Sequence, residues 1–600
     1  MRACVIGAGP SGLVAAKYIL SENRHRPCSV TILEHSKTIG GAFSNKVYDS
    51  VRLVSSKYVT AFSDHRMSEE CPDHPSAQLY VDYLGTYCDT FGLRPCIQFQ
   101  CEVTLISDAA NDGIRTESDD DAAGYSITYI DRSEDDSGDE GKLCTEHFDL
   151  VAVCSGLHNV PHIPSIPNQD TFRGTILHSS SYKDPSSFDG KRVLICGSGE
   201  TAMDIAHRAV MNPICKSVAL NVRRGFLSIP HNIAEDRPLD VYITNLFEHA
   251  YEHPWINALG LRWWMSTIVI RMFLFLAGSS VGFNQWACET HPIRRGYHII
   301  NKSHSAMAHL NVPVKRKSLL GRFWMKVYGE ENLRPIDSFH RTVIAGIDNN
   351  GVTVRFEDGR TFDADIIVLA TGYRQSFPFL DGQIRDEIKN DWIEQGVDAE
   401  SANGECQFAL KEDLLPSQHF IISKSRPRLG FIGFVRPNVG AIPPMSELQM
   451  MWWLCNLRGQ VQPLSAPRKQ LPSYMVLGNK YAYGVDYGNY MHRVAEDIGA
   501  APTLSVLAKS SSPWKALYTY CQGQAHIPLF RLQGPYASKQ CYDIVTNELW
   551  RVCVKRGWVE NIGLASVTWI SLWMNLCACV AECIWGLFTA RRPKFFARYG

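Results

Sequence analysis

The sequence predicts an α/β protein with two parallel-sheet domains, the second inserted into the first, and a C-terminal helical tail that associates with a membrane. Three observations predict it. A short apolar strand leads into a glycine-rich loop and a helix near residue 7, the same pattern returns near residue 197, and a long uncharged segment lies near residue 570. A chain of 600 residues also exceeds what one hydrophobic core supports.

Composition narrows the functional classes. The 60 Lys and Arg residues balance 61 Asp and Glu residues, and no basic stripe with interleaved aromatic side chains occurs, so no nucleic-acid partner is predicted. The 19 cysteines include no C-x-x-C pair. That spacing argues against a metal site and a redox dithiol, and favours a reducing compartment.

The first glycine-rich loop has the pattern of a dinucleotide-binding turn. It follows an apolar strand and reads Gly7-x-Gly9-Pro10-Ser11-Gly12. Gly7 permits the tight turn, Gly9 lets the backbone approach a pyrophosphate, and Gly12 lets the helix pack on the strand. The helix N-terminus then favours an anion. We therefore predict a Rossmann-like domain here.

An acidic residue ends the next strand of this domain. Glu34 follows residues 29–33 and lies twenty-seven positions after Gly7. A carboxylate at this place binds ribose hydroxyls and repels a 2′-phosphate, so the site suits FAD or NAD. Gly41 is assigned to the same site. The alternative is a glycine-rich turn beside a surface glutamate.

The second loop repeats the first with one substitution. After the strand at 191–196 it comprises Gly197, Ser198, Gly199, Glu200, Thr201 and Ala202. Alanine in the third glycine position is an accepted variant that leaves the helix slightly further from the strand.

The charge at the end of the following strand is reversed in this second unit. Counting twenty-seven positions from Gly197 reaches Arg224, with Arg223 beside it. Paired guanidinium groups make charge-assisted contacts to a phosphate. The contrast with Glu34 assigns FAD to the first domain and NADPH to the second; the alternative is two exposed arginines at a strand end.

Further motifs extend over most of the chain. They are Phe172-x-Gly174-x-x-x-His178-x-x-x-Tyr182, the ATGY segment at 370–373, and the stretches at 431–437, 440–449 and 483–488. In this order and spacing they resemble the flavin-containing monooxygenase family. The resemblance implies that Thr371 and Gly372 contact a cofactor. His178 is interpreted as a linker element that orients the two domains. Tyr182, where Baeyer–Villiger relatives usually carry Trp, favours oxygenation of a heteroatom.

One position departs from the family pattern. Val54 stands where the family carries an asparagine that donates hydrogen bonds near the flavin. The neighbouring Ser55 or Ser56 takes over that task, or NADP⁺ and the exclusion of water suffice. Asn438 is a further candidate for a compensating donor. Val54, Ser55 and Asn438 are therefore the predicted catalytic positions.

The resemblance implies a mechanism carried by the cofactors. NADPH reduces FAD, O₂ adds at flavin C4a, and the resulting hydroperoxyflavin transfers one oxygen atom to a small organic substrate at N or S. Two alternatives stay open. One is Baeyer–Villiger oxygenation of a ketone, and the other is an NADPH oxidase or sensor without oxygen transfer. The long inserts favour a biosynthetic role in secondary metabolism.

The order of motifs predicts the domain boundaries. The FAD domain comprises 1–170 and 331–470, the NADP domain comprises 171–330 with an apolar insertion at about 231–315, a helical region covers 471–560, and a tail covers 561–600. Within the insertion an apolar stretch is interrupted by Arg262 and Arg271, which favours docking on a bilayer surface or a buried helical hairpin over a spanning helix.

The tail is predicted to anchor the protein in a membrane. About twenty residues from 562 to 581 carry no formal charge, and four basic residues follow after 590. Trp569, Trp573 and Trp585 suit an interface. The alternative is a docked amphipathic helix. With the catalytic part facing the cytosol, the endoplasmic reticulum is the expected location, and the oligomeric state is left open.

Overall fold

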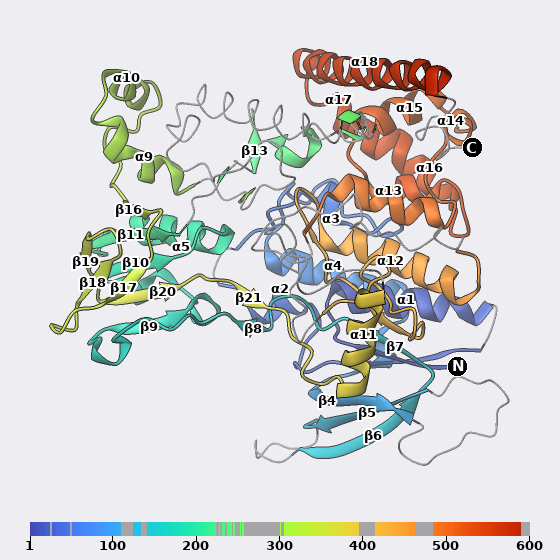
Figure 1. The fold of residues 1–600 in the computed structure, drawn as a ribbon, viewed down its shortest axis with the longest axis horizontal. Coiled ribbons are helices and arrows are strands. Elements are labelled where there is room, and N and C mark those ends of the chain that lie inside the picture. Colours follow the sequence, from blue (N-terminus) through green and yellow to red (C-terminus); the bar gives the residue numbers. More distant parts are fainter. Residues whose placement is uncertain are drawn as a thin grey trace.

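The computed structural model describes most of the chain. The described residues are 1–24, 27–48, 51–109, 124–133, 141–223, 227–228, 231–233, 237–242, 244–245, 253, 255–256, 300–301, 305–394, 414–461 and 484–589. They form two α/β bodies and a helical region edged by one long helix (Figure 1).

The first body is built on a five-stranded parallel sheet in the order β22-β7-β1-β2-β3. Its strands are β1 (Arg2–Ile6), β2 (Ser29–Leu33), β3 (Ile97–Gln98), β7 (Leu150–Val153) and β22 (Leu429–Phe431). Every residue of β7 is buried, as expected of an apolar parallel strand covered on both faces. Because β22 follows β7 by more than 270 residues, the sheet draws on two distant parts of the chain.

Helices and a small sheet cover this first body. The helices are α1 (Pro10–Ser21), α2 (Ala42–Asn45), α3 (Lys57–Thr60), α4 (Ala77–Thr90), α11 (Gly382–Glu394) and α12 (Ile442–Leu457). An antiparallel sheet consists of β4 (Cys101–Asp108), β5 (Tyr125–Asp131) and β6 (Lys142–Phe148). Helix α12 packs against α1 and is buried from Pro443 to Cys455, so it is a core helix.

The second body has a parallel sheet of its own in the order β16-β11-β10-β20-β9. Its strands are β9 (Thr175–His178), β10 (Arg192–Cys196), β11 (Ser217–Val222), β16 (Asp337–His340) and β20 (Ile366–Leu369). Around it lie α5 (Glu200–Met211), α9 (Met307–Lys315), α10 (Leu319–Val327) and the antiparallel strands β17 (Ile344–Ile347), β18 (Thr353–Phe356) and β19 (Thr361–Asp363).

The second body extends further along the chain than the sequence predicts. The boundary placed at residue 330 is wrong for the strands, because β16 pairs with β11 and β20 pairs with β10 in the second sheet. The prediction failed because a buried apolar strand does not encode which distant strand it will join.

Two chain segments connect the bodies. They run antiparallel as β8 (Val160–Pro161) and β21 (Tyr373–Arg374) between the two sheets (Figure 1). A side-chain contact adds to them, since the Tyr48 hydroxyl of the first body donates to Asp204 on α5 at 2.8 Å.

The remaining elements belong to the insertion and the C-terminal region. Those of the insertion are β12 (Leu227–Ser228), β13 (Asn232–Ile233), β14 (Arg237–Pro238), the 3₁₀ turn η7 (Leu239–Tyr242) and β15 (Ile300–Asn301). The C-terminal region has β24 (Gly484–Val485), paired with β23 (Arg436–Pro437), then α13 (Tyr487–Asp497), α14 (Leu504–Ala508), α15 (Pro513–Gln522), α16 (Lys539–Asp543), η10 (Ile544–Leu549), α17 (Trp550–Val554) and α18 (Trp558–Thr589). The apolar stretch around Arg262 and Arg271, and the basic residues after 590, lie outside the described residues.

Helix α18 lies along the edge of the C-terminal region (Figure 1). Its segment Leu572–Thr589 is long and apolar enough to cross a membrane, by length and composition alone. One face packs on the protein: His253 lies 3.0 Å from Glu582, and Ile256 packs against Met574 and Ala578. The large apolar residues exposed on the helix include Trp569, Ile570, Trp573, Leu576, Val580, Ile584, Trp585, Leu587 and Phe588.

Candidate functional site

A single cavity of about 2980 Å³ collects most of the predicted site residues. It lies where the carboxyl ends of strands from both parallel sheets open, which is the usual position of ligands in such folds. The predicted residues that line it are Gly7, Gly9, Pro10, Ser11, Glu34, Gly41, Val54, Ser55, Gly197, Ser198, Gly199, Glu200, Thr201, Ala202, Arg223, Thr371, Gly372 and Asn438. Gly12 is not in its wall, and Arg224 lies outside the described residues.

The first glycine-rich loop is closely fitted to the sheet. Gly7 has φ +102°, and its N–H donates to Leu33 O at 2.8 Å. A Cβ on Gly12 would lie 1.8 Å from Gly7 O, so only glycine lets α1 pass this close to the strand. Gly9 faces Gly41, and a Cβ on Gly41 would lie 3.3 Å from Gly9 Cα. Bare backbone therefore lines this part of the cavity, as a pyrophosphate site requires.

Glu34 lies buried behind this loop. Its carboxylate accepts hydrogen bonds from Ala8 N at 2.6 Å and from Ser36 N at 2.8 Å, and its side chain lines the cavity. The carboxylate is thus held in one orientation beside the place where α1 begins.

Helix α12 brings a second helix N-terminus to the first body's part of the cavity. Ile442 and Pro443, its first residues, line the wall. Ser446 lies 2.9 Å from Ser11 through their hydroxyls, and a Cβ on Gly433 would lie 2.1 Å from Ser11 Oγ. Two helix N-termini consequently face the same space, and each favours negative charge there.

Behind α12 lies a buried polar network that the sequence did not reveal. Glu447 is fully buried and accepts from Tyr18 Oη at 2.8 Å and from Ser63 N at 2.9 Å, with Arg531 3.6 Å away. Arg531 also pairs with Asp64 at 2.7 Å. The network joins α12 to α1 and to the C-terminal region, so it fixes the direction of the α12 N-terminus.

The second loop has the same backbone geometry. Gly197 has φ +139°, its N–H donates to Asn221 O at 2.9 Å, and a Cβ there would lie 2.2 Å from Ala370 O. Gly199 caps α5, and the space around its missing Cβ is open. Ala202 is fully buried, so the helix accommodates the methyl group that replaces a third glycine.

In each body, the glycine-rich loop and the helix N-terminus that follows it form a cradle. Two arginines face the second cradle. Arg223 is exposed directly after β11 and lines the cavity. Arg341, which the sequence reasoning missed, also lines it; its φ is +59°, and its N–H donates to Val222 O at 2.8 Å. Arg341 directly follows β16, and Arg223 directly follows β11. Because these two strands pair side by side, the two arginines lie next to each other.

The three predicted catalytic positions lie in the cavity wall, but two of them are engaged. Val54 is half-buried and offers no donor. The Ser55 hydroxyl donates to Gly440 O at 2.8 Å. The amide oxygen of Asn438 accepts from Val439 N at 2.7 Å and from Tyr487 N at 3.1 Å, and its Nδ2 donates to Asp486 Oδ1 at 3.5 Å.

The two motif residues between the cradles have structural places. His178 Nε2 lies 3.0 Å from Gly372 O and Nδ1 lies 2.9 Å from Ser180 Oγ, so this histidine connects the end of β9 to the segment that precedes β21. Burial lowers the pKa of His178 despite the bond to Gly372. Tyr182 is buried, stacks on Phe188 and does not line the cavity.

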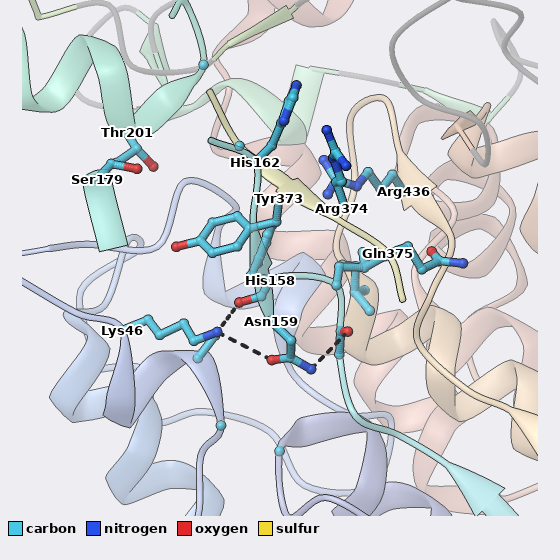
Figure 2. A pocket seen from close by; sticks show the side chains of 18 of the residues that line it. Lys46, His158, Asn159, His162, Ser179, Thr201, Tyr373, Arg374, Gln375 and Arg436 are labelled. Carbon is cyan, nitrogen blue, oxygen red and sulfur yellow. Dashed lines mark hydrogen bonds between the residues drawn. The ribbon is translucent and has the colours of Figure 1, made fainter. Parts of the chain in front are cut away.

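A wall between the cradles that carries three cationic side chains and a histidine went unrecognised in the sequence. Lys46, His158, Arg374 and Arg436 line this part of the cavity (Figure 2). Lys46 Nζ donates to His158 O and lies 3.4 Å from Asn159 Oδ1. The pKa of His158 is lowered, first because protein atoms enclose the residue and then because Arg436 and Lys46 are positively charged. The residue is nevertheless exposed on the side of the cavity. Lys46, His158 and Arg374 lie in none of the motifs. Arg436 lies in the stretch at 431–437, but that motif did not identify it as a residue of the cavity wall.

The residues present fit two dinucleotides. Each cradle offers glycine backbone and a helix N-terminus, and both open into one space. A family model for flavin-binding monooxygenase-like proteins matches residues 1–267 and 340–555. The chain belongs to this family. It is a flavin-dependent monooxygenase, an oxidoreductase, and its cofactors are FAD and NADP(H).

Relatives of this monooxygenase are found in fungi and animals. It is 32% identical over 588 residues to Monooxygenase PC-14 of Penicillium crustosum, with 92% of each chain covered. It is 26% identical to Flavin-containing monooxygenase 5 of Rattus norvegicus over 562 residues, with 89% of each chain covered. The structure of S-allyl-L-cysteine S-oxygenase from Allium sativum shares its fold with a TM-score of 0.50 and 18% identity, covering 83% of this chain and 88% of that chain.

Proposed function

We propose that the monooxygenase holds FAD in the first cradle and NADPH in the second, and transfers one oxygen atom to N or S of a small organic substrate. The observation that carries this proposal is that both cradles open into one cavity, so two bound cofactors would meet there. FAD, reduced by NADPH and reacting with O₂, supplies the oxygenating chemistry when bound.

The division between the cradles is supported by charge. Glu34 is buried with its carboxylate fixed by Ala8 N–H, which suits ribose hydroxyls and opposes a 2′-phosphate. Arg223 and Arg341 stand at the corresponding end of the second sheet and suit that phosphate. In the sequence Arg224 adjoins Arg223 and is included in the proposal.

The protein groups would bind, orient and exclude water. The N-terminus of α12, fixed through Glu447, would stabilise negative charge on a flavin held in the first cradle. Val54 and the linker loop around Thr371 and Gly372 close the wall around the reacting atoms. No carboxylate pair or nucleophilic triad is needed, because the cofactor carries the difficult step.

One observation favours a second function, that of an NADPH oxidase. Val54 donates no hydrogen bond, and the Ser55 hydroxyl is already committed to Gly440 O. A site with few donors protects an oxygenating species less well, so electrons from NADPH would then leave as peroxide.

Product analysis separates these functions. The enzyme is supplied with NADPH, O₂ and a model sulfide, amine or ketone, and both oxygenated product and peroxide are measured. We expect sulfoxide or N-oxide. Ester or lactone from the ketone alone would show a Baeyer–Villiger enzyme, and peroxide alone would show an oxidase.

A variant tests the role of Val54 within this proposal. Val54→Asn restores the family's donor, and we expect it to lower the fraction of NADPH that ends as peroxide. Val51→Asn, at another position in the cavity wall, is the control. Equal peroxide release in the parent enzyme and in Val54→Asn would mean that this position does not govern coupling.

We further propose that α18 attaches the enzyme to a membrane surface, with the catalytic bodies in the cytosol at the endoplasmic reticulum. The exposed face rich in tryptophan suits the headgroup region. A crossing helix would have to break the His253–Glu582 contact and carry a carboxylate into hydrocarbon. The geometry therefore favours a helix lying on the bilayer.

Liposome flotation of the full chain tests the membrane proposal. We expect Trp573→Ala with Trp585→Ala to reduce co-flotation, while Trp514→Ala, an equally exposed tryptophan on α15, leaves it unchanged. Release of the parent enzyme by an alkaline wash would agree with a surface helix, and retention would show a spanning one.

A further inference from the structure

An arginine lies buried at the junction of α17 and α18. Arg556 is 1% exposed and is among the largest fully buried side chains of the described chain. It follows α17 and precedes Trp558, the first residue of α18. The Tyr242 ring, from the insertion in the second body, lies 6.0 Å from its guanidinium carbon. The residue therefore stands where the insertion meets the C-terminal region.

This guanidinium has almost no partners. Among the described residues, its Nε and Nη1 atoms find no hydrogen-bond partner, and Nη2 has only the Cys553 sulfur at 3.6 Å. The nearby carboxylate of Glu560 pairs with another arginine, Arg237, at 3.7 Å. Arg237 Nη1 also donates to the backbone carbonyl of Arg556. Among the described residues, the ionisable groups that raise the pKa of Arg556 are Cys553, Tyr518 and Tyr242, and none of them is a carboxylate.

Neighbouring polar atoms share this lack of partners. The hydroxyl of Tyr242 and the amide oxygen of Gln522 are buried without a hydrogen bond. Tyr242 belongs to η7, and Gln522 is the last residue of α15. The end of α15 lies near Cys553, the residue that Arg556 contacts, because a Cβ on Gly523 would lie 3.4 Å from Cys553 Sγ. Unsatisfied polar atoms from η7, α15 and the α17–α18 junction therefore occur in this part of the described chain.

The physical cost of this arrangement points to a ligand. Buried polar groups are nearly always hydrogen-bonded, and ordered water can satisfy them. Water does not neutralise a charge, and an arginine stays protonated when buried. A guanidinium in a low-dielectric interior costs several kcal/mol unless an anion pairs with it. The described residues supply no such anion.

We propose that Arg556 and Tyr242 form a binding site for a compact oxyanion, a carboxylate or a phosphate. The guanidinium and the phenol hydroxyl are both donors, and a carboxylate or phosphate oxygen accepts from them. The bound anion links η7 of the insertion to the start of α18.

Occupation of this site acts on the catalytic cavity through η7. Asp240, two residues before Tyr242, accepts from Ser56 N at 2.7 Å, and Ser55 next to it lines the cavity. The anion thus fixes the segment that supports the Val54–Ser55 wall. The inference does not depend on which substrate the enzyme oxygenates.

Thermal unfolding of the full chain tests the site. The enzyme is freed of small anions by gel filtration into a sulfonate buffer and titrated with acetate or with inorganic phosphate. We expect a saturable rise in Tm of roughly 2–4 °C, because a ligand that binds only the folded state stabilises it by mass action. A response to phosphate alone indicates a free inorganic ion, and a response to acetate alone indicates the carboxylate of an organic acid.

Two variants and one control decide the outcome. Arg556→Met removes the charge at similar volume and abolishes the rise, while Arg551→Met, on the exposed side of α17, keeps it. Tyr242→Phe keeps the charge and shifts the titration to higher anion concentration, which decides the matter if Arg556→Met does not fold. An equal rise in the parent and Arg556→Met would overturn the proposal.

A tightly held anion is detected separately. Protein freed of small anions is denatured, and the released anions are identified by ion chromatography and mass spectrometry. One equivalent released from the parent and none from Tyr242→Phe or Arg556→Met supports the site. A parent that neither responds to added anions nor releases one overturns it.

Discussion

The two dinucleotide cradles share one backbone device and differ in what surrounds it. In both, the first glycine has positive φ and donates to the end of the neighbouring strand, from Gly7 to Leu33 and from Gly197 to Asn221. In the first, Gly12 lies where a Cβ would be 1.8 Å from a carbonyl oxygen, while the second holds Ala202 without a clash. Under the proposed assignment, the loop makes a phosphate site, and the side chains at the next strand end select the nucleotide.

The tightness of the first cradle leads to the largest expected effect. Gly12→Ala should weaken FAD retention by at least about tenfold, because the methyl group forces α1 away from the strand. The measurement is the ratio of flavin to protein absorbance after purification. The matched change Ala202→Gly should leave flavin content unaltered; full flavin in Gly12→Ala would remove the distinction between the cradles.

The charge at the second cradle should give a smaller but selective effect. Arg223→Ala is expected to raise the KM for NADPH about 10–100-fold and leave that for NADH unchanged, because one charge-assisted contact is lost. Arg355→Ala, exposed on β18, serves as the control. If the two nucleotides lose affinity equally, Arg223 does not read the 2′-phosphate.

Glu34, the acidic residue of the first cradle, provides the corresponding test for FAD. Glu34→Gln keeps one acceptor oxygen for Ala8 or Ser36 and should lower FAD affinity about fivefold, a loss of about 1 kcal/mol. Titration of the apoprotein with FAD measures it. Glu102→Gln, elsewhere in the same cavity wall, should bind FAD normally. A rise in the KM for NADPH would place Glu34 at the wrong cofactor.

The opposite ends of the two sheets are expected to affect stability and not cofactor affinity. Asp149 accepts from Arg2 N at 2.7 Å and Asp365 accepts from Arg192 N at 2.8 Å, but only Asp365 also pairs with the guanidinium of that same arginine. Those hydrogen bonds to Arg192 lower the pKa of Asp365 to about 2. Because this folded-state pKa is depressed, the stabilisation is complete above the unfolded pKa near 4 and is lost as pH falls towards 2.

Asp365→Asn should therefore destabilise the second body by about 1–2 kcal/mol at pH 7, less than the full shift implies because the pair is partly exposed. Asp149→Asn should cost about 1 kcal/mol or less. Urea unfolding at pH 7 and below pH 4 measures both. A penalty for Asp365→Asn that stays constant through this range would show that its ion pair contributes nothing.

Much of the candidate site could be predicted from sequence because its signals are local. Within each cradle, the glycine spacing, the apolar strands and the charged residue at the next strand end, Glu34 or Arg223, fall within about thirty residues. Their backbone consequences, such as the positive φ of Gly7 and Gly197, follow from the sterics of one tight turn.

The sequence by itself determined the two cradles, their order along the chain and the family. Only the tertiary structure decided that β16 and β20 complete the second sheet, that Arg341 stands beside Arg223, and that Ser55 is committed to Gly440 O. It also brought Lys46, Arg374 and Arg436 into one wall and left Arg556 buried without a carboxylate. The physical reason is that strand pairing, burial and hydrogen bonding between distant residues depend on three-dimensional packing, which no short spacing in the chain records.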